Sequence, residues 1–134
     1  MQGKFILARD HEIETVEWGE RAWLSLPSTT GADSLVVVVV DLQPGFGHNF
    51  HIHPNQEELV YVLSGQIEQW LESEKQILKA GDSAFIPTNV VHASFNVSDE
   101  PVKVLAILGP AIGEEGYELI EVGDQEPWIS LRQQ

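Results

Sequence analysis

Short runs of β-branched and other apolar residues, separated by turn residues, follow one another along most of this chain. The clearest run is LVVVVV at residues 35–40, which ends at the turn residues QPG at 43–45. β-Branched residues favour strands, whereas proline and glycine favour the turns between them. By the same pattern we expect strands over residues 22–26, 59–63, 66–71, 83–86, 92–97 and 103–108. No segment has the spacing of a long amphipathic helix, and residues 126–129 are expected to open at most a short C-terminal turn.

Many short strands at regular spacing are typical of an all-β sandwich or barrel. The chain has 134 residues and contains no internal repeat, low-complexity segment or linker, so we expect one domain over residues 1–134. Within it we distinguish an N-terminal strand segment (1–34), a barrel core (35–108) and a C-terminal extension (109–134).

One hairpin is predicted in detail, with Ser64-Gly65 as its two-residue turn. One face would then carry Glu58, Val60, Val62, Ile67, Gln69 and Leu71, and the other Leu59, Tyr61, Leu63, Gln66, Glu68 and Trp70. Because both faces are substantially apolar, we expect each to be covered. A terminal segment of the same chain or a second subunit could provide the outer cover, and we expect a homodimer with Trp70 facing outward at an interface.

The charge balance narrows the range of partners. The chain has 7 Lys and Arg against 21 Asp and Glu, which gives a formal net charge of −14. Such a surface repels nucleic-acid phosphates and anionic lipid headgroups, so neither nucleic acid nor a membrane is an expected partner. The N-terminus lacks the apolar core of a signal peptide and no run approaches about 20 apolar residues, so we expect a cytoplasmic protein.

The histidines suggest a metal site. Three of the five lie at positions 48, 51 and 53, followed closely by two adjacent carboxylates, and His92 comes 34 residues after Glu58. A His-x-His pair on a strand points both rings to one face, about 6–7 Å apart. Since the chain has no cysteine, a metal would have to bind nitrogen and oxygen ligands. Neutral imidazoles with a carboxylate suit a divalent transition metal.

The register leaves some alternatives open. Glu58 is at an odd offset from His53, so it can share a face with the histidines only if residues 54–56 interrupt the strand, and Glu57 is the competing ligand. His48 would face away from His51 on a regular strand, although a role at the mouth of a pocket is an alternative. His11 is expected to be an ordinary surface histidine.

Two ordered motifs carry a family resemblance. They read G-x5-H-x-H-x4-E-x6-G through Gly45, His51, His53, Glu58 and Gly65, and G-x5-P-x-N-x2-H-x3-N through Gly81, Pro87, Asn89, His92 and Asn96. This pattern resembles the two motifs of the cupin superfamily, whose fold is a double-stranded β-helix, or jelly-roll, barrel. Asn89 stands where the second motif usually has glycine, and asparagine tolerates the left-handed backbone that such a turn needs.

The resemblance implies that His51, His53, Glu58 and His92 bind one divalent metal (Fe, Mn, Ni, Cu or Zn), and it favours Glu58 over Glu57. A metalloenzyme acting on a small organic molecule is then expected, with dioxygenase-type chemistry favoured and Glu58 also able to accept a proton. The alternatives are a metal-dependent isomerase, lyase or cyclase, and a non-catalytic small-molecule-binding or sensing module. Strand pairing adds Val60, Ile67, Gln69 and Ser94 as candidate substrate-binding residues inside the barrel.

Overall fold

The computed structural model describes residues 3–132 and contains two antiparallel sheets with three single-turn helices. The strands are β1 (Glu12–Val16), β2 (Gly19–Ser25), β3 (Val36–Leu42), β4 (Gly47–Ile52), β5 (Glu57–Ser64), β6 (Gln66–Leu71), β7 (Glu74–Lys79), β8 (Ser83–Ile86), β9 (His92–Phe95), β10 (Val102–Gly109) and β11 (Ile120–Glu121). The helices are a 3-10 turn at Ala8–Asp10, α1 (Pro27–Thr30) and α2 (Trp128–Leu131). No helix in this part of the chain is long and apolar enough to cross a membrane.

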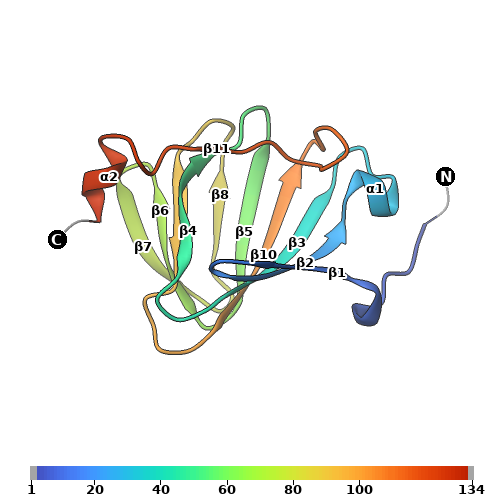
Figure 1. The fold of residues 1–134 in the computed structure, drawn as a ribbon, viewed down its shortest axis with the longest axis horizontal. Helices are drawn as coiled ribbons and strands as arrows, with labels where there is room; N and C mark the ends of the chain where they lie inside the picture. Colours follow the sequence, from blue (N-terminus) through green and yellow to red (C-terminus); the bar gives the residue numbers. More distant parts are fainter. Residues whose placement is uncertain (1–2, 133–134) are drawn as a thin grey trace.

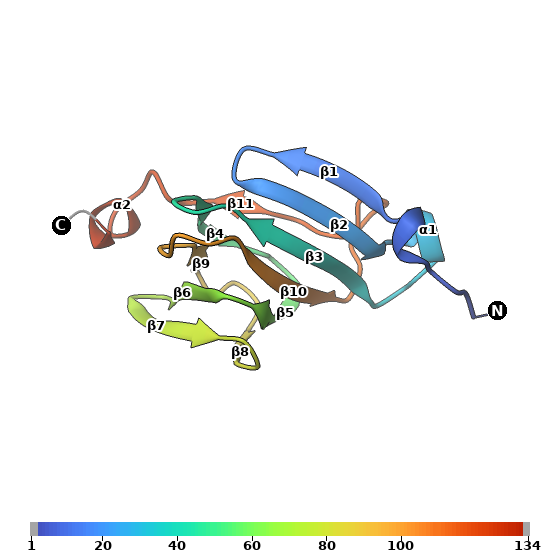
Figure 2. The same ribbon diagram turned by 90° about the horizontal axis from the view of Figure 1, so that it is seen from below.

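The two sheets face each other and together form a jelly-roll barrel (Figures 1 and 2). One sheet has the strand order β1-β2-β3-β10-β5-β8, and the other has the order β11-β4-β9-β6-β7. Most neighbours in these sheets are far apart in the sequence, because the chain repeatedly crosses from one sheet to the other. The all-β jelly-roll architecture expected from the sequence is therefore confirmed.

Alternating side chains from both sheets fill the interior. Along β5 every second residue is buried, and β10 repeats this alternation. The largest apolar cluster joins Val60 and Val62 of one sheet to Ile67 of the other, and all three are at most 4% exposed. A period of two is what a strand with one buried face requires.

The predicted hairpin at Ser64-Gly65 is wrong. β5 pairs with β10 and β8, whereas β6 pairs with β7 and β9, so the chain changes sheet at Gly65. Gly65 has a φ of +81°, and a Cβ there would lie 2.9 Å from Val102 Cγ2. The inner face was nonetheless assigned correctly, because the alternation of buried residues does not depend on which strand is the partner.

Two strands, β1 and β7, were not predicted from the sequence. β1 and β7 are edge strands, and nearly every residue in each is exposed. An edge strand that buries almost no side chain has no reason to alternate apolar with polar residues. The strands were therefore missed where burial does not constrain the sequence.

The outer face of the β4–β9–β6–β7 sheet is covered by the C-terminal segment of the same chain. Trp128 at the start of α2 stacks on Phe50 with 5.6 Å between ring centroids, and Phe50 contacts Trp70 edge-on at 5.5 Å. Arg132 Nε donates to Glu68 Oε2 at 2.7 Å, and the Trp70 indole donates to the same oxygen at 2.8 Å. Trp70 faces away from the barrel interior as expected, but α2 rather than another subunit leaves it only 4% exposed.

Replacing Trp128 with alanine should destabilise the protein, because this side chain seals the cluster around Phe50. Full truncation of a buried aromatic residue costs about 3–5 kcal/mol, and Trp128 is only half-buried, so we expect a loss of about 2 kcal/mol in the free energy of unfolding. Urea denaturation measures this. Ile129→Ala, one residue along α2 at a 40% exposed position, is the matched control and should change stability by less than about 0.5 kcal/mol. Equal losses in both variants would contradict this packing.

Candidate metal centre

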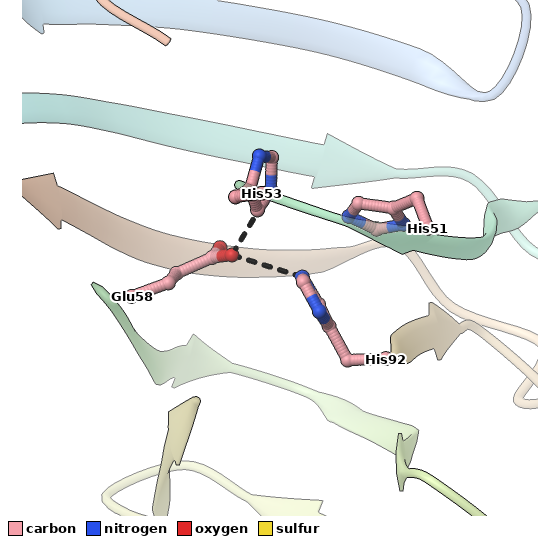
Figure 3. A group of neighbouring side chains, drawn as sticks. All are labelled: His51, His53, Glu58 and His92. Atoms are coloured by element: carbon pink, nitrogen blue, oxygen red, sulfur yellow. Dashed lines mark ion pairs between the residues drawn. The ribbon is translucent and has the colours of Figure 1, made fainter. Parts of the chain in front are cut away.

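Three imidazoles and one carboxylate converge on one another from separate strands of the barrel (Figure 3). His51 belongs to β4, His53 follows it directly, Glu58 belongs to β5, and His92 begins β9. One ligand atom from each residue lies within 4.8 Å of the corresponding atoms of the other three. The four side chains are between 2% and 8% exposed. The folding of two separate sequence motifs thus produces one compact, buried set of donors.

Backbone carbonyls fix the orientation of all three rings. The Nδ1 atoms of His51, His53 and His92 lie 2.6, 2.7 and 3.0 Å from the carbonyl oxygens of Asn49, Glu118 and Val90 respectively. A carbonyl only accepts hydrogen bonds, so each Nδ1 carries the proton and donates it. In its neutral form each ring would then present an unprotonated Nε2 toward the other ligands, which is the arrangement usual for metal-binding histidines.

The facing atoms of these four side chains would suit a bound cation. Glu58 Oε1 lies 3.2 Å from His53 Nε2 and 3.0 Å from His92 Nε2 (Figure 3). Both Glu58 Oε1 and His92 Nε2 are fully buried without a well-formed hydrogen bond within residues 3–132. Buried polar atoms are costly when unpaired, and here acceptor atoms face one another. A divalent metal would satisfy them together, whereas a single proton can satisfy only one contact.

Electrostatics keep the carboxylate ionised. Burial alone would raise the pKa of Glu58, but its contacts with His53 and His92 outweigh this and lower that pKa far below its ordinary value. Burial, and then the neighbouring histidines, lower the pKa of His51 well below 6.5. Burial also tends to lower the pKa of His53, but Glu58 outweighs it and the net shift is upward. A neutral His51 beside an ionised Glu58 suits metal coordination.

The short interruption after His53 gives the two glutamates opposite directions. β4 ends at Ile52 and β5 begins at Glu57, and between them Asn55 has a φ of +69°. This break turns Glu58 inward at 8% exposure, whereas Glu57 is exposed.

Gln56 holds the interruption in place, and nothing in the sequence pattern marked it. It is 1% exposed, and its amide nitrogen donates to the carbonyls of Pro110 and Gly116 at 2.8 and 2.9 Å. Its amide oxygen accepts from the Glu118 backbone at 3.1 Å. Gln56 therefore attaches the loop between two of the candidate ligands to the C-terminal part of the chain.

His48 lies beside the site, contrary to its expected direction. A β-bulge between His48 and His51 breaks the alternation, so the two rings stack at 3.7 Å between centroids. His48 also stacks on Trp18 at 5.7 Å, and its Nε2 lies 3.1 Å from Glu121 Oε1. It lines the same cavity as the four candidate ligands, which matches the alternative that we kept for it. His11 does not line this cavity.

The cavity beside the site has a volume of about 80 Å³, enough for roughly half a dozen waters or a small organic molecule. Two of the four predicted substrate-binding residues, Val60 and Ser94, line it. The other two lie in the barrel away from it. Ile67 is fully buried in the core, and Gln69 accepts a 2.6 Å hydrogen bond from Ser94 and donates to the Trp70 carbonyl at 3.2 Å.

Several lining residues come from outside the two motifs. Trp18, Arg21 and Trp23 belong to the N-terminal hairpin, and Tyr117 belongs to the segment before β11. The positions of these residues were not predicted. The strand expected over residues 22–26 begins earlier, at Gly19, and Arg21 and Trp23 share one of its faces because they are two residues apart.

This combination of a jelly-roll barrel and a buried three-histidine, one-glutamate set defines a class of small β-barrel proteins with a site that can hold a metal. The chain belongs to the cupin family: the family model described as "Cupin domain" matches residues 38–108. The resemblance in the two motifs is therefore confirmed. The matched segment includes all four candidate ligands but not Arg21 or Tyr117.

The relatives have diverse names. Polyketide synthase CurC of Streptomyces cyaneus is 31% identical over 110 residues, which are 82% of this chain and 71% of that protein. Pectin degradation protein KdgF of Dickeya dadantii is 31% identical over 75 residues, which are 56% of this chain and 68% of that protein. The solved structure of KdgF from Halomonas sp. matches with a TM-score of 0.73 at 25% identity, covering 84% of this chain and 97% of that one.

Glu58→Gln should weaken metal binding at least about tenfold, because it removes the only negative charge from the donor set. Glu57→Gln is the matched control, since it makes the same chemical change one residue away on the exposed side of β5. Titration with Zn²⁺, monitored by calorimetry, measures both affinities. A larger loss in the Glu57 variant would mean that the ligand assignment is one residue out of register.

Proposed function

We propose that this protein is a metalloenzyme that converts a small organic molecule at the centre formed by His51, His53, Glu58 and His92. The observation that carries this proposal is the convergence of three imidazole rings and a buried carboxylate beside a largely apolar cavity. Such donors suit Fe, Mn, Ni, Cu or Zn as the divalent ion. The four protein ligands leave coordination positions for water or substrate.

A bound metal would supply Lewis-acid polarisation of a substrate oxygen, or a place to assemble substrate beside dioxygen. The protein contributes the shape and polarity of the site. Val60 offers an apolar contact and Ser94 a hydroxyl, and both belong to the proposed substrate-binding surface. A carboxylate with a lowered pKa holds a proton weakly but can still bind a metal. We therefore assign metal binding as the first role of Glu58 and proton acceptance as its second.

Dioxygenase-type chemistry is the first reaction class to test, because histidine and carboxylate ligands with open positions suit Fe(II) and dioxygen. Metal-dependent isomerase, lyase or cyclase chemistry is the second. It is supported by relatives whose names refer to polyketide synthesis and pectin degradation rather than to oxygen. A non-catalytic binding or sensing module would use the same cavity without turnover.

The variant with both His51→Ala and His53→Ala should lose its metal, because half of the donor set is removed. Elemental analysis of untagged protein purified without chelators is expected to find about one equivalent of a transition metal in the wild type and almost none in this variant. Circular dichroism should show that the barrel stays folded. Full metal occupancy in the variant would overturn the assigned site.

The same pair of proteins tests catalysis. Metal-loaded wild type and the double variant are each incubated with a mixture of small metabolites, under air and anaerobically, and loss of any component is followed by mass spectrometry. Metal-dependent loss only under air supports a dioxygenase, and equal loss without oxygen supports isomerase, lyase or cyclase chemistry. Binding without conversion in either condition would support the non-catalytic module.

A homodimer also forms part of this proposal. The outer face of the β5–β8 edge exposes Leu59, Tyr61, Leu63 and Phe85 at 37%, 38%, 41% and 54%. Leu59 and Phe85 lie directly opposite each other in the ladder, so they form one apolar patch. The strongly acidic composition still argues against nucleic acid and membranes as partners, and we retain the cytoplasm as the proposed location.

Introducing charge into this patch should dissociate the dimer. Light scattering is expected to give a dimer mass for the wild type and a monomer mass for the Leu59→Glu, Phe85→Glu double variant, because two buried carboxylates would each lack a partner. Ile77→Glu is the control: Ile77 is 45% exposed on β7 of the opposite sheet and its replacement should leave the dimer intact. A monomeric wild type would refute the proposal.

A further inference from the structure

We propose that Arg21 binds a carboxylate of the ligand, so that the protein acts on small organic monocarboxylates with an apolar body. This inference rests on the proposed function in one respect, namely that the ligand occupies the cavity beside the metal centre. It adds a substrate class and a recognition residue on the N-terminal hairpin, outside the segment that matches the family model.

Arg21 lines the same cavity as the four candidate metal ligands. It is the only Lys or Arg among the residues described as lining that cavity, in a chain with just 7 such residues and a net charge of −14. Its side chain is 15% exposed. Arg21 is therefore not an ordinary solubilising surface charge, because its side chain is largely shielded from water and lies beside a cavity.

Aromatic rings hold the guanidinium group in place. Its central carbon lies 5.8, 5.3 and 5.9 Å from the ring centres of Trp18, Trp23 and Tyr117. Trp23 and Tyr117 also stack on each other at 5.5 Å, and the Tyr117 ring lies 6.3 Å from that of His53. One aromatic ring therefore separates the Arg21 guanidinium from a candidate metal ligand. Such packing orders the group before any ligand arrives, which reduces the entropy lost on binding.

The described contacts of Arg21 do not use all of its N–H groups. One terminal nitrogen pairs with Glu14 Oε1 at 2.6 Å, and the other donates to the Tyr117 hydroxyl at 3.2 Å. Nε is fully buried and has no hydrogen-bond partner among residues 3–132. A guanidinium has five N–H donors in a planar fork that matches a carboxylate. Four of these N–H groups belong to the two terminal nitrogens, and the contacts with Glu14 and Tyr117 use two of them, so two terminal N–H groups remain to bind a ligand carboxylate, whereas the enclosed Nε does not face the cavity.

The remaining lining indicates a monocarboxylate rather than a phosphate or a polar sugar. It is largely apolar, with valines, leucines and an alanine from β3, β5 and β10, such as Val38, Val60 and Ala106. A single guanidinium, already partly compensated by Glu14, can offset one negative charge but not a phosphate dianion as well. The small cavity volume also favours a compact ligand.

Glu14 supports a competing structural explanation, in which Arg21 only ties the N-terminal hairpin together. Glu14 and Arg21 are direct neighbours in the β1–β2 ladder, and Glu14 Oε1 also accepts from the Trp23 indole at 3.2 Å. If this were the role of Arg21, removing either partner would harm binding equally. If Arg21 binds the ligand, Glu14 competes with the ligand, and its removal should preserve or strengthen carboxylate binding.

The test uses Zn²⁺-loaded protein and calorimetric titration with three matched pairs: benzoate and benzamide, phenylacetate and phenylacetamide, butyrate and butyramide. We expect the wild type to prefer at least one carboxylate over its amide. Arg21→Gln should reduce that preference about ten- to a hundredfold, with the amide little affected. Glu14→Gln should bind the carboxylate at least as tightly as the wild type. Arg21→Lys keeps a charge without the fork and should restore part of the preference.

Several outcomes would overturn the proposal. The first is a wild type that shows no preference for a carboxylate over its amide. The second is an Arg21→Gln variant that keeps this preference, which would place the carboxylate on the metal. The third is an equal loss of carboxylate binding in the Glu14 and Arg21 variants. Tighter binding of methyl phosphate than of every carboxylate would overturn the substrate class. If Arg21→Gln does not fold, Arg21→Lys is compared with the wild type instead, and an undiminished carboxylate preference in that variant would contradict recognition by the guanidinium fork. Zinc content is measured in every variant, so failure of carboxylate recognition with zinc retained leaves the proposed metal centre standing.

Discussion

The central constraint in this barrel is the burial of three imidazole rings and one carboxylate against one another. Three rings donate Nδ1 protons to backbone carbonyls, and their Nε2 atoms face one another and the Glu58 carboxylate. When all three rings are neutral, these facing atoms are desolvated acceptors, and a proton or a cation between them relieves their repulsion. The apolar core and the ladder of the barrel supply stability that does not depend on this cluster.

Sequence patterns predicted what depends on burial or on local backbone geometry. The alternation in β5 and β6 assigned inner faces, and the turn position of Asn89, with a φ of +66°, has the left-handed backbone that the motif requires. The pairing of β5 with β6 was wrong because alternation says which side of a strand is buried, not which strand lies next to it. The direction of His48 could not be predicted either, since a bulge adds a residue without any change of composition.

The position of each candidate ligand depends on residues far from the motifs in sequence. The Glu118 carbonyl orients His53, while Gln56 bonds to the carbonyls of Pro110 and Gly116 and so fixes the loop between His53 and Glu58. The accepting atoms in these contacts are backbone carbonyls, which any residue can provide, so their positions leave no mark in the sequence. This explains why residue types could suggest the candidate ligands, whereas the groups that orient them could not be predicted.

The same C-terminal segment contacts both Arg21 and a candidate metal ligand. Tyr117 accepts a hydrogen bond from Arg21 and lies beside His53, and its neighbour Glu118 holds the His53 ring through its carbonyl. A shift of this segment would therefore move a candidate metal ligand and the Arg21 guanidinium together. The family segment supplies the four candidate metal ligands, and parts of the chain outside it add aromatic rings and one cation to the same cavity. In the function proposed above, chemistry at the metal and selection of the ligand would therefore be carried by different parts of the sequence, and residues 116–118 contact both.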